Sequence, residues 1–513
     1  MTSRPLSKTG DLSGAGRISD NSPAPDDSPV SGKSRVLERL RQLRAGDAPT
    51  HGGHVLAYVY DAGMPELDEL ADAAATMARP VNGLDPTVFP SVAAMERDVL
   101  GFVRRAVHGG RGVVGSVTSG GTESCLLAVK TARDLWRAEH ADPRVRPRLL
   151  APATAHAAFQ KAARMFDLDW DPVPCAPEGT VAADDLIERM DADVALVVVS
   201  APAYPSGVVD PIREVAGAAR RRGIRCHVDA CFGGLVLPWW PGAPGWDFRV
   251  PGVTSLSADL HKFGYAPKGV SVLLHRGRHA HRAQFFATTR WAGYPVVNPT
   301  LLGSKSASSL AAAWAITGRL GARGYEELVS SLVRTASDIR AKVDDIRGLA
   351  VMGDPIGPAI ALVTDDAVPP TERVDPHRLA DAMSQRGWKI QHQPGFVQSD
   401  GSRIPRSAHL TLTPVLESTI DEFLAALTGA SDAVRGRRPA SGRVSAALVR
   451  ALGYREDRVP SPAAAWTLLR LAGAGSVRPS QPMSGLMALI EELPAPVAEA
   501  LLTEVLARMS EPR

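Results

Sequence analysis

The sequence predicts an α/β protein whose large domain is built on a mostly parallel sheet. Apolar runs typical of buried strands lie at residues 148–151, 194–200 and 225–228, and helical patterns at 185–190 and 212–220 lie between them. Strands joined by helices pair in parallel, and such sheets bind ligands at the carboxyl ends of their strands. Polar residues just after these runs are therefore the first candidates for a functional site.

The remaining segments extend this plan. A helix opens at Ser91, and further strands are expected at 255–257 and 270–274. Shorter helices and strands then alternate and indicate a smaller α+β domain, and two or three helices are expected after a linker at 435–439. We therefore expect five parts: a disordered tail (1–33), an N-terminal arm (34–90), the large domain (91–324), the small domain (325–430) and a helical C-terminal extension (431–513).

Composition excludes several classes of protein. The 513 residues include 58 Lys+Arg and 55 Asp+Glu, a balance that does not indicate a nucleic-acid partner. The four cysteines have neither zinc-ligand spacing nor the density of a disulfide framework, so we expect a reducing compartment and no metal site. No signal peptide and no apolar run of about 20 residues is found, so we expect a cytoplasmic protein without a membrane span.

A lysine near the end of an apolar run is the first chemical candidate. Lys262 lies in the segment 257–265 (SADLHKFGY), between His261 and Phe263. A lysine in apolar surroundings loses ammonium solvation, so we expect a lowered pKa and an amine that can form a Schiff base with a carbonyl. The alternative is a strand-end lysine whose stem is buried and whose ammonium reaches water.

A glycine-rich loop before a helical pattern is the second candidate. Gly121 and Thr122 lie in residues 117–124 (VTSGGTES), directly before an apolar helix pattern at 126–133. Backbone N–H groups at such a helix start, with the positive end of the helix dipole behind them, form a cup for phosphate. The alternative is a well-capped loop with no ligand.

Two more side chains follow predicted strands. Asp229 ends the run 224–229, where a carboxylate can keep a ring nitrogen protonated, although it could instead cap a turn. His156 follows the strand at 148–151, where its imidazole can lie flat on an aromatic ring, although it could instead be a core histidine with satisfied hydrogen bonds.

In chain order, a phosphate cup, a histidine, an aspartate and a lysine match the pyridoxal 5′-phosphate site of the aspartate aminotransferase fold. The chain resembles the group II pyridoxal-phosphate-dependent decarboxylase superfamily, and within it the sphingosine-1-phosphate lyase branch. The resemblance spans most of residues 50–430. The segments that carry it are 118–124 (TSGGTES), 200–210 (SAPAYPSGVVD), 227–234 (HVDACFGG), 257–269 (SADLHKFGYAPKG) and 298–304 (NPTLLGS).

The resemblance implies the pyridoxal-phosphate-dependent transferase fold (fold type I) and a role for each candidate. Lys262 would hold the cofactor as a Schiff base, Asp229 would pair with its pyridine nitrogen, and His156 would stack on its ring. The phosphate would bind to Gly121 and Thr122. Other implied contacts are His261 beside the phosphate, Ser200 at the ring oxygen or the substrate, and Ser304, which would reach the phosphate of a second subunit in a homodimer.

The resemblance also implies three substrate-binding positions. Lyases of this branch hold the substrate phosphate with a Tyr, a His and a Lys, and Tyr60 and Lys268 match two of these. Asp85 stands at the position of the histidine, and a carboxylate there would repel a phosphomonoester. An amino acid, or an amine with a neutral or cationic tail, would then be a better substrate. The alternative is that Asp85 points away and caps the next turn, because Pro86 follows it.

The expected function is a carbon–carbon lyase that acts on a small-molecule amine, either decarboxylating an amino acid or cleaving a 2-amino alcohol. One alternative is an aminotransferase on the same fold, which would need an arginine such as Arg403 or Arg406 to bind the substrate carboxylate. Another is a catalytically silent scaffold, against which the intact set of site residues argues.

Overall fold

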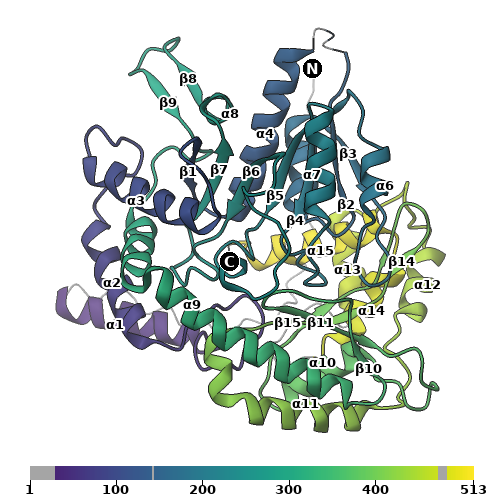
Figure 1. Ribbon diagram of the computed structural model, residues 1–513. Helices are drawn as coiled ribbons and strands as arrows, with labels where there is room; N and C mark the ends of the chain where they lie inside the picture. Colours follow the sequence, from purple (N-terminus) through teal and green to yellow (C-terminus); the bar gives the residue numbers. More distant parts are fainter. Residues whose placement is uncertain (1–28, 141, 143, 472–481, 513) are drawn as a thin grey trace, which may run out of the picture. The chain divides into compact units, whose positions relative to one another are not determined.

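The computed structural model describes residues 29–140, 142, 144–471 and 482–512 (Figure 1). The chain forms two compact units, residues 1–48 and 49–513. The first contains helix α1 (Pro29–Arg44), which spans the expected division between the tail and the arm at residues 33 and 34. Proline is favoured at the first position of a helix, which accounts for a start at Pro29. The rest of the predicted disordered tail lies outside the described residues.

The second unit is organised around a seven-stranded sheet in the order β1-β7-β6-β5-β4-β2-β3. All neighbouring strands from β6 to β3 pair in parallel, and β7 pairs antiparallel with both β1 and β6. The predicted mostly parallel sheet is therefore confirmed. Its strands are β1 (Val113–Thr118), β2 (Arg148–Pro152), β3 (Asp169–Val173), β4 (Val194–Ser200), β5 (Arg225–Asp229), β6 (Val253–Ala258) and β7 (Ser271–Arg276).

Helices cover both faces of this sheet, which explains the unbroken apolar sequence of β4. Leu196 and Val198 pack into the core beneath α4 and α5, whereas Val197 and Val199 pack into the main core on the opposite face with α7. A strand buried on both faces needs apolar residues at every position. The covering helices are α3 (Pro90–Ala106), α4 (Gly121–Glu139), α5 (Ala158–Phe166), α6 (Ala183–Glu188), α7 (Ile212–Arg221) and α8 (Arg278–Gln284).

The small domain shares a long helix with the large one. Helix α9 (Ser308–Asp344) runs through the predicted boundary at residue 324 and is interrupted at Gly321, whose backbone is non-helical with φ 54° and ψ −170°. The boundary therefore falls inside a helix. A second sheet has the order β10-β11-β15-β12 and is antiparallel. Its elements are β10 (Leu349–Val351), β11 (Ala359–Thr364), α10 (Pro376–Gln385), β12 (Gln391–Gln393), β15 (Ser407–Thr411), the 3₁₀ helix η2 (Pro414–Thr419) and α11 (Ile420–Val434).

The C-terminal extension has four described helices, not the two or three expected, and α11 runs past the predicted start of the extension at residue 431. Its helices are α12 (Arg443–Ala451), α13 (Pro462–Leu471), α14 (Ser484–Glu492) and α15 (Ala495–Met509). They share a core that includes Val449, Leu469 and Val497. The buried Glu491 of α14 pairs with Arg406 of the small domain. The Gly395 N–H also donates a 2.9 Å hydrogen bond to the Glu491 carboxylate. Together these two contacts fix α14 against the small domain.

Shorter elements complete the second unit. Strands β8 and β9 form a hairpin that stands away from the central sheet beside α8 (Figure 1). None of the described helices is both long and apolar enough to cross a bilayer. The remaining elements are α2 (Pro65–Ala78), η1 (Leu237–Trp239), β8 (Phe286–Thr288), β9 (Val296–Asn298), β13 (Phe396–Val397) and β14 (Arg403–Ile404).

Candidate active site

A cavity of about 530 Å³ lies at the carboxyl ends of β4, β5 and β6. This is where a parallel sheet binds ligands. The cavity gathers residues that are far apart in the sequence, from the N-terminal arm to the small domain. Eight of the predicted site residues line it: Tyr60, Gly121, Thr122, His156, Ser200, Asp229, His261 and Lys262.

Lys262 is held by a carboxylate that sequence reasoning did not single out. Its Nζ lies 3.0 Å from Oδ2 of Asp259, whose side chain is only 1% exposed. Ser271 Oγ donates a 2.6 Å bond to the other carboxylate oxygen. The signal was present in the sequence, because Asp259 precedes Lys262 by three residues, close enough for one turn to bring the two side chains together.

The ion pair reverses the expected protonation of Lys262. Burial is the largest single influence and lowers the pKa of this amine, but Asp259 and the smaller contributions of Cys231, Tyr60 and Asp229 together outweigh it. The pKa of Lys262 is therefore raised well above its ordinary value. Burial likewise opposes ionisation of Asp259, yet Lys262 and His261 hold the pKa of that carboxyl well below its ordinary value. The predicted lowering of the lysine pKa is wrong because the amine lies among buried acidic groups, of which Asp259 has the largest effect.

The start of α4 forms the predicted anion cup. The helix begins at Gly121, so the first N–H groups have no partner within it and point out of its end. A Cβ at Gly121 would lie 2.6 Å from Oδ2 of Asp259 and 2.9 Å from Sγ of Cys231. Only glycine therefore lets the helix start approach the lysine loop this closely. Glu123 fixes the loop, since its carboxylate accepts bonds of 2.6 Å from the N–H groups of Ser119 and Leu301.

Asp229 ends β5 and is 8% exposed. Its Oδ1 accepts a 3.0 Å bond from the Cys231 N–H, and Oδ2 has no hydrogen-bond partner among the residues that the structure describes. On the same strand, His227 lies between the hydroxyls of Ser255 and Ser257 at 2.9 and 3.2 Å. Burial lowers the pKa of His227 to about 4, so the imidazole behind Asp229 is neutral at pH 7.

His156 and Ser200 occupy the ends of neighbouring strands. His156 follows β2, is exposed to the cavity, and its Nδ1 accepts a 3.2 Å bond from the Ala158 N–H. Ser200 is the last residue of β4, and its N–H donates a 2.6 Å bond to the buried Asp210. Backbone contacts thus fix the residues that bear both side chains at the cavity wall.

The far wall of the cavity is built by the arm and the small domain, and sequence reasoning missed most of it. Tyr204 donates a 2.6 Å bond to Gln391, whose amide donates a 2.8 Å bond to Tyr58. Tyr60 packs edge-on against the rings of Phe232 and Phe263. No local motif indicates that these residues meet, because the chain segments that carry them are far apart.

Three predicted residues do not line the cavity of this chain. Lys268 lies behind Tyr60, with its Nζ 4.3 Å from the ring centre and donating to the carbonyl of His261 at 2.9 Å. Partial burial and the Lys262 ammonium lower the pKa of Lys268 to about 8. Asp85 is exposed and accepts bonds from the Thr87 N–H and hydroxyl at 2.9 and 2.6 Å. This is the turn-capping geometry that we considered as the alternative for Asp85.

Ser304 is the third of these residues. It is exposed, and its hydroxyl lies 3.2 Å from the amide nitrogen of Asn82. The two arginines considered for an aminotransferase are committed elsewhere: Arg406 pairs with Asp375 and Glu491, and Arg403 lies 3.5 Å from Glu491. The substrate-binding arginine that this alternative needs is therefore not supplied by Arg403 or Arg406.

The site residues fit pyridoxal 5′-phosphate. The start of α4 offers N–H donors for the phosphate, Lys262 offers an amine for the aldehyde, and Asp229 offers a free carboxylate oxygen for a protonated ring nitrogen. Asp259 holds the Lys262 amine in this site through their ion pair. Fold and site together define a pyridoxal-phosphate-dependent enzyme of fold type I.

Comparison with known proteins agrees with this class. Residues 58–362 match the family described as "Pyridoxal-dependent decarboxylase conserved domain", and residues 445–508 match "Pyridoxal-dependent enzyme, C-terminal putative HTH domain". Sphingosine-1-phosphate lyase 1 of Mus musculus is 35% identical over 389 residues, which cover 75% of this chain and 65% of the mouse protein. The chain belongs to the pyridoxal-dependent decarboxylase family, and its cofactor is pyridoxal phosphate.

Solved structures place the fold in the same family. A sphingosine-1-phosphate lyase of Burkholderia pseudomallei is 32% identical with a TM-score of 0.72, and the match covers 86% of this chain and 97% of that one. Glutamate decarboxylase of Lactobacillus brevis has a TM-score of 0.71 at 20% identity, covering 82% and 96% of the two chains. The second likeness concerns the fold alone. Together the comparisons confirm the predicted fold type and the resemblance to the lyase branch.

Proposed function

We propose that this protein is a pyridoxal-phosphate-dependent carbon–carbon lyase that cleaves a bond at the amine-bearing carbon of its substrate. The observation that carries the proposal is that the ion pair of Lys262 and Asp259 lines the same cavity as the carboxylate of Asp229. The family match over residues 58–362 supports it. A silent scaffold would have no need to keep a buried lysine and a buried carboxylate in contact.

The residues divide the chemical work. When bound, pyridoxal phosphate supplies an electron sink for the charge left on the substrate carbon. Asp229 holds the proton on the ring nitrogen that this sink requires, and Gly121 and Thr122 bind the phosphate. Asp259 sets the protonation of Lys262, which carries a proton between its amine and the substrate carbon. His156 covers one side of the site and, as a flat ring, restricts the substrate to the other.

We propose a phosphorylated 2-amino alcohol of sphingoid type as the substrate. The relatives with 35% and 32% identity are named sphingosine-1-phosphate lyases. The main objection from the sequence was a carboxylate at Asp85, but that side chain is engaged by Thr87 and does not line the cavity of this chain. Lys268, whose ammonium lies 4.3 Å from the ring centre of the cavity residue Tyr60, is the proposed cation for the substrate phosphate. Decarboxylation of an amino acid is the other reaction that the same site could perform.

We further propose a cytoplasmic homodimer. The β8–β9 hairpin and the segment after it expose large apolar side chains that a monomer leaves in water: Phe286, Trp291, Tyr294, Val297, Leu301 and Leu302. Ser304 follows this segment, which supports its expected role at the phosphate of a second subunit. All four cysteines are free and buried, as suits a reducing compartment. We propose no nucleic-acid partner, because Arg443 and Arg508 of the extension pair with Glu492 and Glu504.

The cofactor and the reaction can be tested in sequence. The purified protein should show an absorbance band in the imine region that borohydride removes, with the reduced adduct found on the Lys262 peptide by mass spectrometry. Sphingosine-1-phosphate should then yield a long-chain aldehyde, and a panel of amino acids should yield no carbon dioxide. Absence of both band and adduct after adding cofactor would overturn the enzyme proposal. Carbon dioxide without aldehyde would replace the proposed substrate with an amino acid.

A further inference from the structure

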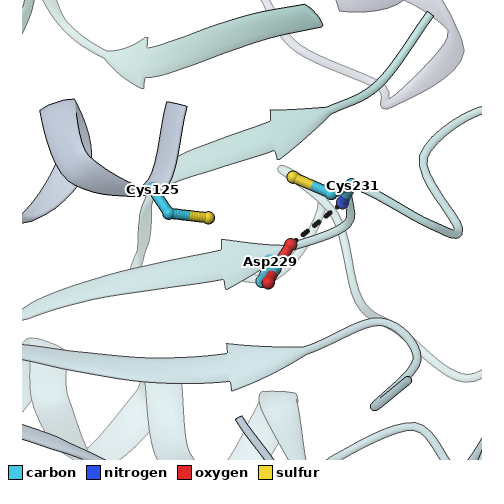
Figure 2. Close-up of side chains that lie close together, drawn as sticks. All are labelled: Cys125, Asp229 and Cys231. Carbon is cyan, nitrogen blue, oxygen red and sulfur yellow. Dashed lines mark hydrogen bonds between the residues drawn. The ribbon is translucent and has the colours of Figure 1, made fainter. Parts of the chain in front are cut away.

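Two thiols and a carboxylate form a compact buried cluster at the floor of the cavity. The Sγ atoms of Cys125 and Cys231 and a carboxylate oxygen of Asp229 all lie within 4.8 Å of one another. Figure 2 shows the two thiols pointing toward each other, with the Asp229 carboxylate beside them. The side chains of Cys125 and Cys231 are 1% and 7% exposed. None of the roles proposed above uses either thiol.

Three separate elements hold this cluster in place. Cys125 lies in the first turns of α4, Asp229 ends β5, and Cys231 follows in the next loop. The Cys231 N–H donates to Asp229 Oδ1 at 3.0 Å, and its Sγ donates to Ser257 Oγ at 3.2 Å. The ligand atoms are therefore positioned by the fold before any ligand arrives, which reduces the entropy lost on binding.

The donor set suits a zinc ion. Zinc takes thiolate sulfur at about 2.3 Å and carboxylate oxygen at about 2.0–2.2 Å in a tetrahedron, so its ligand atoms lie roughly 3.5–3.8 Å apart. In the structure the three ligand atoms lie within 4.8 Å of one another, so they would have to close to this spacing around the ion. Magnesium and calcium prefer sites made of oxygen alone. All three residues also line the cavity, so a fourth position remains open toward it for water.

We propose that the cofactor-free chain binds a zinc ion through Cys125, Cys231 and Asp229, and that this ion and the cofactor exclude each other. The second half rests on the proposed function, because it requires Asp229 to be the partner of the cofactor's ring nitrogen. The Cys231 N–H already donates to Oδ1 of Asp229, so the ring N–H⁺ and the divalent cation would compete for Oδ2. The three ligands of the ion also line the cavity whose residues would hold the cofactor. Zinc availability thus controls how much of the newly made chain can be loaded with cofactor.

Cobalt is the probe for the metal half, because tetrahedral Co²⁺ bound to thiolates has intense visible bands and a sulfur-to-cobalt charge-transfer band. The cofactor is removed from the full chain, which is then titrated with Co²⁺ under reducing conditions. We expect both bands in the wild type and in Cys226→Ala. Cys226 is a matched control because it is also a free, buried cysteine but does not belong to the cluster. It lies on β5, and its side chain packs into the core on the sheet face opposite Asp229. Both bands should be lost in Cys125→Ala.

Two outcomes would overturn the metal site: no bands in the wild type, or bands that survive in Cys125→Ala. A thermal scan guards against misfolding. Zinc should raise the melting temperature of the cofactor-free wild type and of Cys226→Ala, and should leave that of Cys125→Ala unchanged, because only a ligand bound to the folded chain stabilises it. A Cys125→Ala variant that melts cooperatively but is stabilised by zinc as much as the wild type also contradicts the proposal.

Exclusion is tested by titrating pyridoxal phosphate and following the imine band, with and without Zn²⁺. At a zinc concentration 100 times its Kd, the apparent Kd of the cofactor should rise about 100-fold in the wild type. Cys125→Ala, compared with itself in metal-free buffer, should show no change. An unchanged Kd in zinc-loaded wild type overturns exclusion. A chain that fails to bind cofactor even without metal would defeat the proposed function instead, while the cobalt bands still decide the metal site.

Discussion

The two sides of the cavity are built in different ways. The cofactor side comprises Gly121, His156, Asp229, Asp259 and Lys262, and all five lie at strand ends or helix starts of one sheet. The substrate side comprises Tyr58, Tyr60, Tyr204 and Gln391, with Lys268 behind Tyr60, and joins the arm, the large domain and the small domain. The cofactor side forms as soon as the central sheet forms, whereas the substrate side also requires separate chain segments to pack together. We therefore expect changes on the cofactor side to abolish function and changes on the substrate side to alter selectivity.

The strongest test of this contrast compares two lysines. Lys262→Ala should lower kcat/KM by roughly 10⁴-fold or more and remove the imine band, because no other amine is held beside Asp259. Lys268→Ala should keep the band, since its ammonium lies behind Tyr60. Absorbance spectra and aldehyde release measure the two effects. A Lys262→Ala protein that still forms a borohydride-sensitive adduct would remove Lys262 from its role.

The next test concerns the anion beneath Lys262. Asp259→Asn should destabilise the cofactor-free chain by about 3 kcal/mol at pH 7, because it leaves a buried ammonium without its partner or forces it to lose its proton. Urea unfolding measures the change, with Asp400→Asn as the exposed control, expected within about 0.5 kcal/mol of the wild type. Equal effects of the two substitutions would mean that the ion pair contributes nothing specific.

Asp259 also shows what the sequence could and could not predict. The strand ends, the glycine loop, Asp229 and Lys262 could be placed because apolar runs and turns are local signals. The protonation of Lys262 could not be derived, because it depends on which side chain the loop turns toward it. The substrate side, with Tyr204 bonded to Gln391, depends on long-range packing that no local pattern records.

The continuous helix α9 and the paired arginines illustrate the same limit of local patterns. The boundary expected at residue 324 lies within α9, because a helix that serves both domains carries one continuous pattern across them. Arg403 and Arg406 looked available for a substrate because their partner, Glu491, lies far along the chain in an extension whose packing the sequence did not indicate. Sequence reasoning thus identified chemistry better than it identified which charges are already paired.

A pH-dependent test addresses the support of the cofactor side. Burial raises the pKa of Asp210 to about 7, and its Oδ1 has no hydrogen-bond partner in the described part of the chain. Between the unfolded pKa of about 3.9 and pH 7 the folded chain keeps a proton that the unfolded chain has lost, so Asp210's contribution to stability falls as pH rises. Asp210→Asn can still accept the bond from the Ser200 N–H, but it does not titrate.

The stability of Asp210→Asn relative to the wild type should therefore increase by roughly 2–3 kcal/mol between pH 5 and pH 7. Urea unfolding of both proteins across this range measures the difference, which also cancels the titration of all other groups. A difference that is constant with pH would show that Asp210 is ionised in the folded chain. It would then carry a buried negative charge close to Asp229 instead of a neutral carboxyl.

The smallest effect is expected on the substrate side. Gln391→Ala removes the amide that joins Tyr204 to Tyr58, and should raise KM by about 5- to 10-fold with little change in kcat, equivalent to one lost hydrogen bond. Gln393→Ala is the matched control, because Gln393 lies on the same strand but its side chain accepts a bond from Ser407 and does not line the cavity. A large loss of kcat in Gln391→Ala would mean that the substrate side also positions the reacting bond, and the division between the two sides would no longer hold.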